Sequence, residues 1–260
     1  MLEQILAAVR EEGALIRGAL AEKIEAKEKT GPEDLVTNYD RLVQSHLEQK
    51  LRALLPEAGF LGEEGLRVRS EDGAVFIIDP IDGTMNFSRG YQRSCISVAL
   101  ARGDRMELGV VYDPYQEELF WAQRGKGAFL NGRPIRVSKR PLEAGLVMFG
   151  TSPYYRAIAD RTFALARALF DRSLDVRRSG SAAIDLCAVA AGRAEVFYEI
   201  LLSPWDYAAA GLILEEAGGV IGSLEGGEVS LTERSSVLAA NAAAWPAAQQ
   251  IVREVYKIDS

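Results

Sequence analysis

The sequence contains little histidine, cysteine or methionine and no long uninterrupted apolar segment. Its 260 residues include one histidine, two cysteines and four methionines. Because the only histidine, His46, falls inside an expected helix, a catalytic arrangement of serine, histidine and aspartate is disfavoured and His46 is expected to be structural. No run approaches the roughly 20 apolar residues that cross a membrane. The N-terminal segment has acidic residues and helical periodicity rather than the basic start of a signal peptide, so we expect a cytoplasmic protein without a membrane partner.

An excess of basic residues is also absent. The chain has 30 lysines and arginines against 37 aspartates and glutamates, a formal net charge of -7 and a pI near 5.0. This balance makes nucleic acid an unexpected partner, because a generic binder of nucleic acid or of a membrane surface presents a basic face. It does not exclude an anionic substrate, since bound divalent cations reverse the charge of a site locally.

The two cysteines lie in apolar surroundings. Cys95 falls in a strand-like run and Cys187 in a helix-like run. Buried free thiols are the usual role of cysteines in such a setting, and they fit a reducing compartment. A disulfide between the two remains open at this point.

The first half of the chain has helices followed by short strands. Apolar residues at helical spacing predict an amphipathic helix from Leu2 onward, interrupted at Gly31–Pro32, and a second helix over 38–54. From 75 to about 137, short β-rich runs separated by Gly, Asp and Pro predict a meander of antiparallel strands. The intervening FLGEEG, residues 60–65, is expected to be a polar loop.

The last third alternates between strands and helices. The expected elements are a strand at 146–150, a helix at 155–170, a strand at 174–177, a helix at 181–191, a strand at 194–198, a helix at 206–217, strands at 219–222 and 236–240, and a helix at 243–256. We therefore expect one unit over 1–260, with helices and an antiparallel sheet in 1–143 and an α/β half in 144–260. The pattern alone supports a mixed α+β and α/β chain.

The segment IIDPIDGTMNF, residues 77–87, places Asp79 and Asp82 three residues apart after a β-branched run. Asp, Pro and Gly also make ordinary turns, and this spacing alone is typical of a turn or cap. A turn of this kind can equally aim both carboxylates and the Ile81 carbonyl at one point. Two such carboxylates repel unless a proton or a cation lies between them, and Mg²⁺ prefers oxygen ligands. Gly83 and Thr84 offer N–H groups and a hydroxyl to a phosphate.

Two further acidic features accompany this segment. Glu63 and Glu64 lie in the glycine-flanked FLGEEG, just before the strand that leads to Asp79. In PWDYAAAG, Asp206 stands at the start of an apolar helix, where an aspartate is often an N-cap.

Together, GEE, DPIDGTMNF and WDYAAAG, with EEAGG downstream, resemble the inositol monophosphatase family of Mg²⁺-dependent, lithium-sensitive phosphatases. The resemblance in element order extends over essentially the whole chain. It implies a layered α-β-α-β-α sandwich of the type shared with fructose-1,6-bisphosphatase, and a homodimer. It also implies hydrolysis of a small-molecule phosphate monoester by metal-activated water, with two or three Mg²⁺ ions per site, Mn²⁺ as an alternative and Li⁺ as an inhibitor.

The resemblance carries specific roles onto the acidic residues. It implies that Glu63, Asp79 and the Ile81 carbonyl bind a first Mg²⁺, and that Asp79, Asp82 and Asp206 bind a second. Glu63 would also reach a weaker third ion through water.

The phosphate and the attacking water have their own implied residues. Gly83 and Thr84 match phosphate-binding positions, and Thr84 with Glu63 would orient or deprotonate the water. Asp40 matches an aspartate that supports Thr84, or is simply the N-cap of the second helix. Lys29 matches a lysine of a mobile loop near the site, or is a solvated charge.

For the alcohol part of the substrate, the segment RRSGSAAIDL resembles the family's G-[ST]-A stretch. Glu199 lies seven residues before Asp206 and matches a glutamate that binds polyol hydroxyls; a surface charge is the alternative. Ser181 is explained equally well as a helix N-cap. The residues implied to contact the substrate are Asp82, Thr151, Gly180, Ser181, Ala182 and Glu199.

Several functions remain open within this resemblance. Inositol 1-phosphate is the favoured substrate, with fructose 1,6-bisphosphate, a dual-specificity sugar phosphatase and histidinol phosphate as alternatives. Adenosine bisphosphates rank lower, because no basic, aromatic base-stacking cluster stands out. Arg177 and Arg178 would serve a second phosphate or are surface charge. The alternative from another class is an interaction protein that keeps the fold and associates with RNA polymerase or ribosome factors.

Overall fold

A computed structural model describes residues 1–19, 26–31, 34–68, 70 and 73–256. Helices flank and separate its sheets. Their bounds are α1 (Leu2–Gly18), α2 (Asn38–Leu54), α3 (Thr84–Ser88), α4 (Ala159–Phe170), α5 (Ala182–Ala190), α6 (Pro204–Glu216) and α7 (Trp245–Tyr256). None of the described helices is long and apolar enough to span a membrane.

The strands form a small hairpin and two large sheets among the described residues. The hairpin pairs β1 (Ala26–Gly31) with β2 (Asp34–Thr37). The first large sheet has the order β10-β9-β8-β7-β6-β5-β3-β4. Its strands are β3 (Gly59–Gly62), β4 (Arg67–Val68), β5 (Ala74–Asp82), β6 (Cys95–Arg102), β7 (Arg105–Asp113), β8 (Glu118–Gln123), β9 (Ala128–Leu130) and β10 (Arg133–Ile135).

The second large sheet belongs to the later half of the chain and has the order β12-β11-β13-β15-β14. Its strands are β11 (Leu146–Phe149), β12 (Asp175–Arg177), β13 (Val196–Leu202), β14 (Gly219–Gly222) and β15 (Ser235–Asn241). β11 runs parallel to β12 and β13, whereas β15 is antiparallel to β13 and β14.

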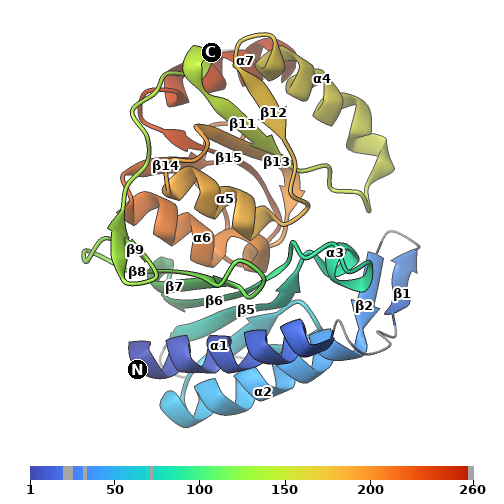
Figure 1. Cartoon of the computed structure of the whole chain (residues 1–260), viewed down its shortest axis with the longest axis vertical. Coiled ribbons are helices and arrows are strands. Elements are labelled where there is room, and N and C mark those ends of the chain that lie inside the picture. Colours follow the sequence, from blue (N-terminus) through green and yellow to red (C-terminus); the bar gives the residue numbers. More distant parts are fainter. Residues whose placement is uncertain (20–25, 32–33, 69, 71–72, 257–260) are drawn as a thin grey trace.

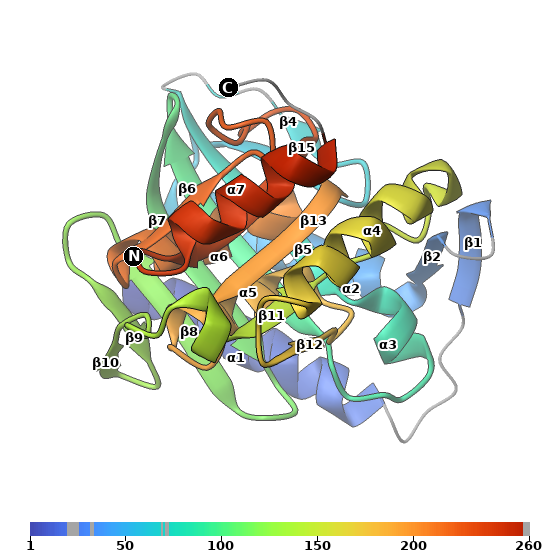
Figure 2. The ribbon, with the colours of Figure 1, turned by 90° about the horizontal axis from the view of Figure 1, so that it is seen from above.

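The elements stack as five layers (Figure 1). Helices α1 and α2 cover one face of the first sheet, and α5 and α6 lie between the two sheets. Helices α4 and α7 pack together across the outer face of the second sheet, over β13 and β15 (Figure 2). The expected α-β-α-β-α sandwich is therefore confirmed.

Three apolar clusters fill the spaces between these layers. The middle one is rich in alanine and packs α5 and α6 against both sheets. Small side chains let helices and sheets approach closely. The close packing of the central layer fixes the positions of the residues at the N-termini of α5 and α6.

The prediction of a loop at FLGEEG was wrong for its first residues. Phe60, Leu61 and Gly62 belong to β3, which pairs in parallel with β5. The predicted antiparallel meander over 75–137 is confirmed by the pairings of β5 to β10, and β3 adds one parallel pair beside β5. The β1–β2 hairpin was not expected either. Lys29 belongs to β1, and its side chain lies outside the described residues.

Strand β5 does not end in a turn at the two aspartates, as the sequence suggested, but runs through both of them. Asp79 pairs with Ser97 and Asp82 with Cys95, so β5 has one extra residue between these pairs. Such a bulge changes the alternation of side chains along a strand. It turns Asp79 and Asp82 to the same side of the sheet, and it occurs at Pro80, which has no N–H to donate.

One buried acid fastens the segment that connects the two large sheets. Glu195 is 1% exposed and accepts hydrogen bonds from Ser138 Oγ (2.7 Å), Arg140 Nε (2.8 Å) and the Leu146 N–H (2.6 Å). Ser138 and Arg140 lie in the connection between β10 and β11, so Glu195 holds this connection against the start of β13.

The two cysteines and His46 have the structural roles that the sequence predicts. Cys95 and Cys187 are buried free thiols, and the open possibility of a disulfide is excluded. His46 lies in α2, where its Nδ1 is 3.0 Å from Glu12 Oε2 of α1.

Candidate active site

A polar cavity of about 360 Å³ opens where the middle helical layer meets the ends of both large sheets. Almost all of the predicted site residues line it, although they come from positions as far apart as 63 and 206. These residues are Glu63, Asp79, Ile81, Asp82, Gly83, Thr84, Gly180, Ser181, Ala182, Glu199 and Asp206. Asp40 lies behind this wall, fully buried, and Thr151 is not part of the lining in the described structure.

Four carboxylic acids meet at one end of the cavity. Burial raises the pKa of Asp79 well above its usual range, and the nearby charges of Glu63, Asp82 and Asp206 raise it further. Burial also raises the pKa of Asp206, helped by the charges of Asp82 and Glu63. The pKa of Asp82 is likewise raised by burial. Each acid therefore disfavours the ionisation of the others unless a positive charge is added.

The donor set fits a hard divalent cation. Within the described residues, no lysine or arginine forms an ion pair with Asp79, Asp82 or Asp206, so none of the basic side chains described there relieves the repulsion. As the side chains are placed in the described ranges, no three acidic, cysteine or histidine groups stand close enough together to hold a metal ion by themselves. Mg²⁺ is commonly held by one or two carboxylates with waters and substrate phosphate oxygens, so an open set of carboxylates suits this ion.

Glu63 is positioned by α2 and β5. Its N–H donates to the Ile78 carbonyl (3.3 Å), and the N–H of the next residue, Glu64, donates to Gln44 Oε1 (3.1 Å). Gln44 also donates from Nε2 to the Glu64 carbonyl (3.4 Å). The loop that carries Glu63 is thereby tied to a buried position of α2.

Thr84 begins α3 and is held by Asp40. Its Oγ1 donates to Asp40 Oδ1 (2.9 Å) and is also 3.0 Å from the Ile81 carbonyl. The other oxygen of Asp40 accepts from the Thr37 N–H (2.8 Å) and from the Thr37 hydroxyl. Thr37, not Asp40, is the N-cap of α2, and Asp40 is the third helical residue of a capping box. The N-cap alternative for Asp40 was therefore wrong, and Asp40 takes part in the cap only through its hydrogen bonds to Thr37.

Asp206 occupies the equivalent position of α6. The N-cap is Ser203, whose N–H donates to Asp206 Oδ2 (2.7 Å), so the expectation that Asp206 itself caps the helix was wrong. The carbonyl of Trp205 accepts from Ser97 Oγ of β6 (3.2 Å), which ties this helix end to the strand beside Asp79.

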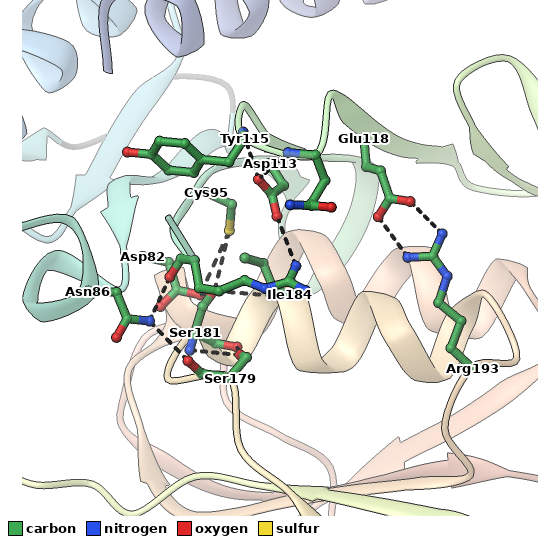
Figure 3. Close-up of polar contacts among 12 residues, drawn as sticks. Asp82, Asn86, Cys95, Asp113, Tyr115, Glu118, Ser179, Ser181, Ile184 and Arg193 are labelled. Carbon is green, nitrogen blue, oxygen red and sulfur yellow. Dashed lines mark hydrogen bonds and ion pairs between the residues drawn. The ribbon is translucent and has the colours of Figure 1, made fainter. Parts of the chain in front are cut away.

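Asp82 is joined to α5 through one of its oxygens (Figure 3). Its Oδ2 accepts from Ser181 Oγ (2.6 Å) and from the Ala183 N–H (2.7 Å), and Cys95 Sγ lies 3.9 Å away. Ser181 is also the N-cap of α5, as expected for its alternative role. The hydrogen bonds that Asp82 receives from described residues all fall on Oδ2.

Glu199 lies on β13 at the other end of the cavity and is almost fully buried. Its Oε1 accepts from the Ser152 N–H (2.7 Å) and Ser152 Oγ (3.1 Å). A Cβ on Gly150 would lie 1.8 Å from Glu199 Oε2, so only glycine leaves space for this carboxyl. Burial raises the pKa of Glu199 to about 7. The surface-charge alternative for Glu199 is therefore wrong.

Several lining residues were not found by sequence reasoning. Asp185 is 1% exposed, burial raises its pKa to about 7, and its Oδ1 has no hydrogen-bond partner among the residues that the structure describes. The Arg234 guanidinium lies over the Tyr155 ring, 5.1 Å from the ring centre, and both residues line the cavity. They come from two separate segments, so no local motif signals them. Ser152, by contrast, is one position from the predicted Thr151. Of the two arginines considered for a second phosphate, Arg178 lines the cavity and Arg177 does not.

The chain belongs to the inositol monophosphatase family, whose family model matches residues 1–260. This membership agrees with the layered sandwich and with the row of carboxylates beside Gly83 and Thr84.

Individual relatives fall into two groups by name. The Nus factor SuhB of Vibrio cholerae is 36% identical over 258 residues, which are 98% of this chain and 96% of the relative. The solved structure of the Thermotoga maritima IMPase is 32% identical with a TM-score of 0.90, over 98% of each chain. An IMPase/NADP phosphatase complexed with Mg²⁺ and phosphate is 27% identical with a TM-score of 0.86, over 96% of this chain and 93% of the other.

Proposed function

We propose that the chain is a Mg²⁺-dependent phosphatase that hydrolyses the phosphate monoester of a small polyol, with inositol 1-phosphate as the favoured substrate. The observation that supports this most is the convergence of four carboxylic acids beside Gly83 and Thr84, of which Asp79 and Asp82 are buried and the other two half-buried. Glu199 stands at the opposite end of the same cavity, where a hydroxyl of the leaving alcohol would lie.

The residues divide the work along the cavity. Glu63, Asp79, the Ile81 carbonyl, Asp82 and Asp206 would hold Mg²⁺ ions. Bound there, Mg²⁺ would supply a water of lowered pKa and neutralise charge on the phosphate and the leaving oxygen, as two-metal sites do.

The remaining residues position the reactants. The N–H groups at Gly83 and Thr84, at the start of α3, donate to the phosphate. Thr84 Oγ1, held by Asp40, orients the attacking water, and Glu63 accepts its proton. Gly180, Ser181 and Ala182 border the alcohol, and Glu199 accepts hydrogen bonds from its hydroxyls. Such hydrogen bonds reject alcohols that lack the hydroxyls.

A role in transcription is the second candidate. It is favoured by the name Nus factor SuhB that a relative with 36% identity carries. The carboxylates, Thr84 and Glu199 are all present in this chain, so an interaction role would accompany catalysis rather than replace it. Homodimer formation and inhibition by Li⁺ belong to the same proposal.

The first test replaces two proposed ligands in turn: Asp79, which would serve both ion positions, and Asp206, which would serve the second. Asp79→Asn and, separately, Asp206→Asn should lower Mg²⁺-dependent phosphate release from inositol 1-phosphate by more than about 10³-fold, because ligand oxygens are lost at constant shape. Fructose 1,6-bisphosphate, histidinol phosphate and adenosine 3′,5′-bisphosphate complete the substrate panel, and a Li⁺ titration accompanies it.

Retention of most activity in either folded variant would contradict the assignment of these ligands. Absence of release from every ester by the wild-type chain, together with capture of transcription factors from a native extract, would favour the second candidate.

A further inference from the structure

Two backbone turns from distant parts of the chain touch each other at the edge of the cavity. Gly83 follows the aspartates of β5, and Gly180 lies between β12 and α5. Both have φ of 91°, a conformation that favours glycine. A Cβ on Gly83 would lie 2.9 Å from the Arg93 carbonyl and 3.3 Å from the Gly180 carbonyl. The phosphate side and the alcohol side of the site therefore meet backbone to backbone.

The side chain of Asn86 joins these turns. Its Nδ2 donates to the Arg93 carbonyl (2.6 Å) and to the Ser179 carbonyl (3.0 Å). Both partners are carbonyl oxygens, so the amide nitrogen must face them and both of its hydrogens are used. Asn86 lies in α3, two residues after Thr84, and Ser179 is 93 positions further along the chain. Figure 3 shows the amide of Asn86 directed at this loop.

The loop of residues 178–181, here called the Ser179 loop, leads from Asn86 to a predicted metal ligand. Ser179 Oγ accepts from the Ser181 N–H (3.1 Å) and donates to the Ser181 carbonyl (3.1 Å). The Ser179 N–H donates to Asp185 Oδ2 (3.4 Å). Ser181 Oγ and the Ala183 N–H then donate to Asp82 Oδ2. A displacement of Ser179 would therefore change the orientation of Asp82.

We propose that Asn86 is a positioning residue that fixes the Ser179 loop against the Gly83 turn and thereby sets the orientation of Asp82 and the place of Gly180–Ala182. Asn86 acts through Ser179 and Ser181, and no role at the reacting atoms is assigned to it. The expected effects of Asn86 on metal and substrate binding rest on the proposed function. The hydrogen bonds that lead from Asn86 through Ser179 and Ser181 to Asp82 do not depend on it.

A purely structural asparagine would change stability alone, and the chain offers a matched comparison. Asn131 accepts from the Leu119 N–H (2.9 Å) and donates to the Glu117 carbonyl (2.9 Å), in the turn between β9 and β10, away from the cavity. Its φ is 49°, so Asn131→Gly removes the same number of side-chain hydrogen bonds without backbone strain.

The experiment compares Asn86→Ala, Asn86→Ser and Asn131→Gly in the full-length chain. The first readout is hydrogen exchange of the metal-free protein, followed by mass spectrometry of peptides that cover 179–187. We expect exchange there to accelerate at least about tenfold in Asn86→Ala, in line with loss of a fixed hydrogen-bond network. Asn86→Ser keeps one donor and should be intermediate, and Asn131→Gly should leave these peptides unchanged.

The second readout is Mg²⁺ affinity from titration calorimetry, and the third is the separation of KM from kcat. Loss of a group that orients metal ligands typically weakens metal binding by about 10–100-fold, and we expect this for Asn86→Ala but not for Asn131→Gly. The KM for the phosphate ester should rise with it.

Unchanged exchange in 179–187 and unchanged Mg²⁺ affinity in folded Asn86→Ala or Asn86→Ser would overturn the proposal. If exchange and Mg²⁺ affinity change as expected but the wild-type chain releases no phosphate from any ester, the positioning stands and the proposed function fails.

Discussion

Glu199 carries an acidic group in a place where ionisation is costly. Burial raises its pKa from 4.5 to about 7, so the folded chain holds the proton more tightly than the unfolded chain does. By linkage, the free energy of unfolding must then fall as the pH rises from about 4.5 to about 7. Below this window the carboxyl is protonated in both states and no penalty exists.

Glu199→Gln should remove this part of the pH dependence, because glutamine keeps an oxygen for the two Ser152 donors and has no proton to lose. In the metal-free protein at pH 8 the variant should be more stable than the wild type by on the order of 3 kcal/mol at most. Urea denaturation between pH 4.5 and 8 in the presence of a chelator measures the difference. The exposed Glu143 provides the control Glu143→Gln.

If Glu199→Gln and the wild type lose stability in parallel over this window, Glu199 does not titrate there. Some pH dependence will remain in the variant, since burial also raises the pKa of Asp185 to about 7.

At the scale of single residues, the sequence was most informative where chemistry is local. Asp79, Asp82, Gly83 and Thr84 lie within six positions, so a motif can carry them. Asn86 also lies in that motif, but its partner Ser179 is 93 positions away and its contact cannot be inferred from spacing. Each such contact depends on how α3 and the Ser179 loop meet, and sequence patterns do not specify that arrangement.

The start of helix α2 combines a structural and a functional requirement. The capping box of Thr37 and Asp40 satisfies N–H groups of the first turn, and the same Asp40 accepts the hydrogen bond of Thr84. Burial raises the pKa of Asp40, whereas its hydrogen bonds from Thr37 and Thr84 lower it. Thr37 therefore helps Asp40 to remain an ionised acceptor.

Thr37→Ala should lower the free energy of unfolding by about 1–2 kcal/mol, the usual cost of an N-cap. It should also lower kcat for phosphate release, because Asp40 loses a donor and holds Thr84 less firmly. Thr37→Ser keeps the hydroxyl and should restore most of both quantities, which urea denaturation and steady-state kinetics can follow. An equal loss in Thr37→Ser would assign the effect to packing of the methyl group.

Elements with a strong period were predicted well, and short or paired elements were not. Helix α2 was predicted at its observed bounds, 38–54, because five leucine and valine positions mark one face and Pro56 follows it. The strand β3 was missed, because it has four residues, two of them glycines, and exists through its pairing with β5. Its neighbour β4 has only two residues and shows no pattern at all.

At the scale of the whole molecule, the acidic side chains at one end of the cavity repel one another and lower the stability of the fold. Three aspartates there have raised pKa values, so the metal-free fold is less stable at neutral pH than it would be with neutral side chains. A bound cation would remove this repulsion. Global stability is thus expected to respond to Mg²⁺.

We expect Mg²⁺ to raise the unfolding temperature of the wild type, by a stabilisation of about 2.7 kcal/mol when free Mg²⁺ is 100 times its Kd. Asp79→Asn should do the opposite of a typical core mutation. Without metal at pH 8 it should unfold at a higher temperature than the wild type, and added Mg²⁺ should change it little. Thermal denaturation with chelator and with a Mg²⁺ series tests both statements, with Ca²⁺-free buffers throughout.

If Mg²⁺ does not change the unfolding temperature of the wild type, or if Asp79→Asn is less stable than the wild type without metal, this account is contradicted.

The order of layers could be anticipated from family resemblance, but the contacts that hold the connection between the two large sheets could not. Glu195 holds the β10–β11 connection through partners at 138, 140 and 146, and nothing in the local sequence around Glu195 indicates a buried acid.

The bulge in β5 has a consequence for how this sequence can change by insertion and deletion. Phe76, Ile78 and Ile81 belong to the cluster beneath α1 and α2, whereas Ile77 packs in the cluster on the other side of the sheet, toward which Asp79 and Asp82 are turned. A regular strand of the same length would direct Asp82 to the opposite face, into the apolar cluster beneath α1 and α2. A relative with two residues between the aspartates therefore needs the bulge to keep both carboxylates on one side, whereas a relative with a single residue there would keep them on one side without it.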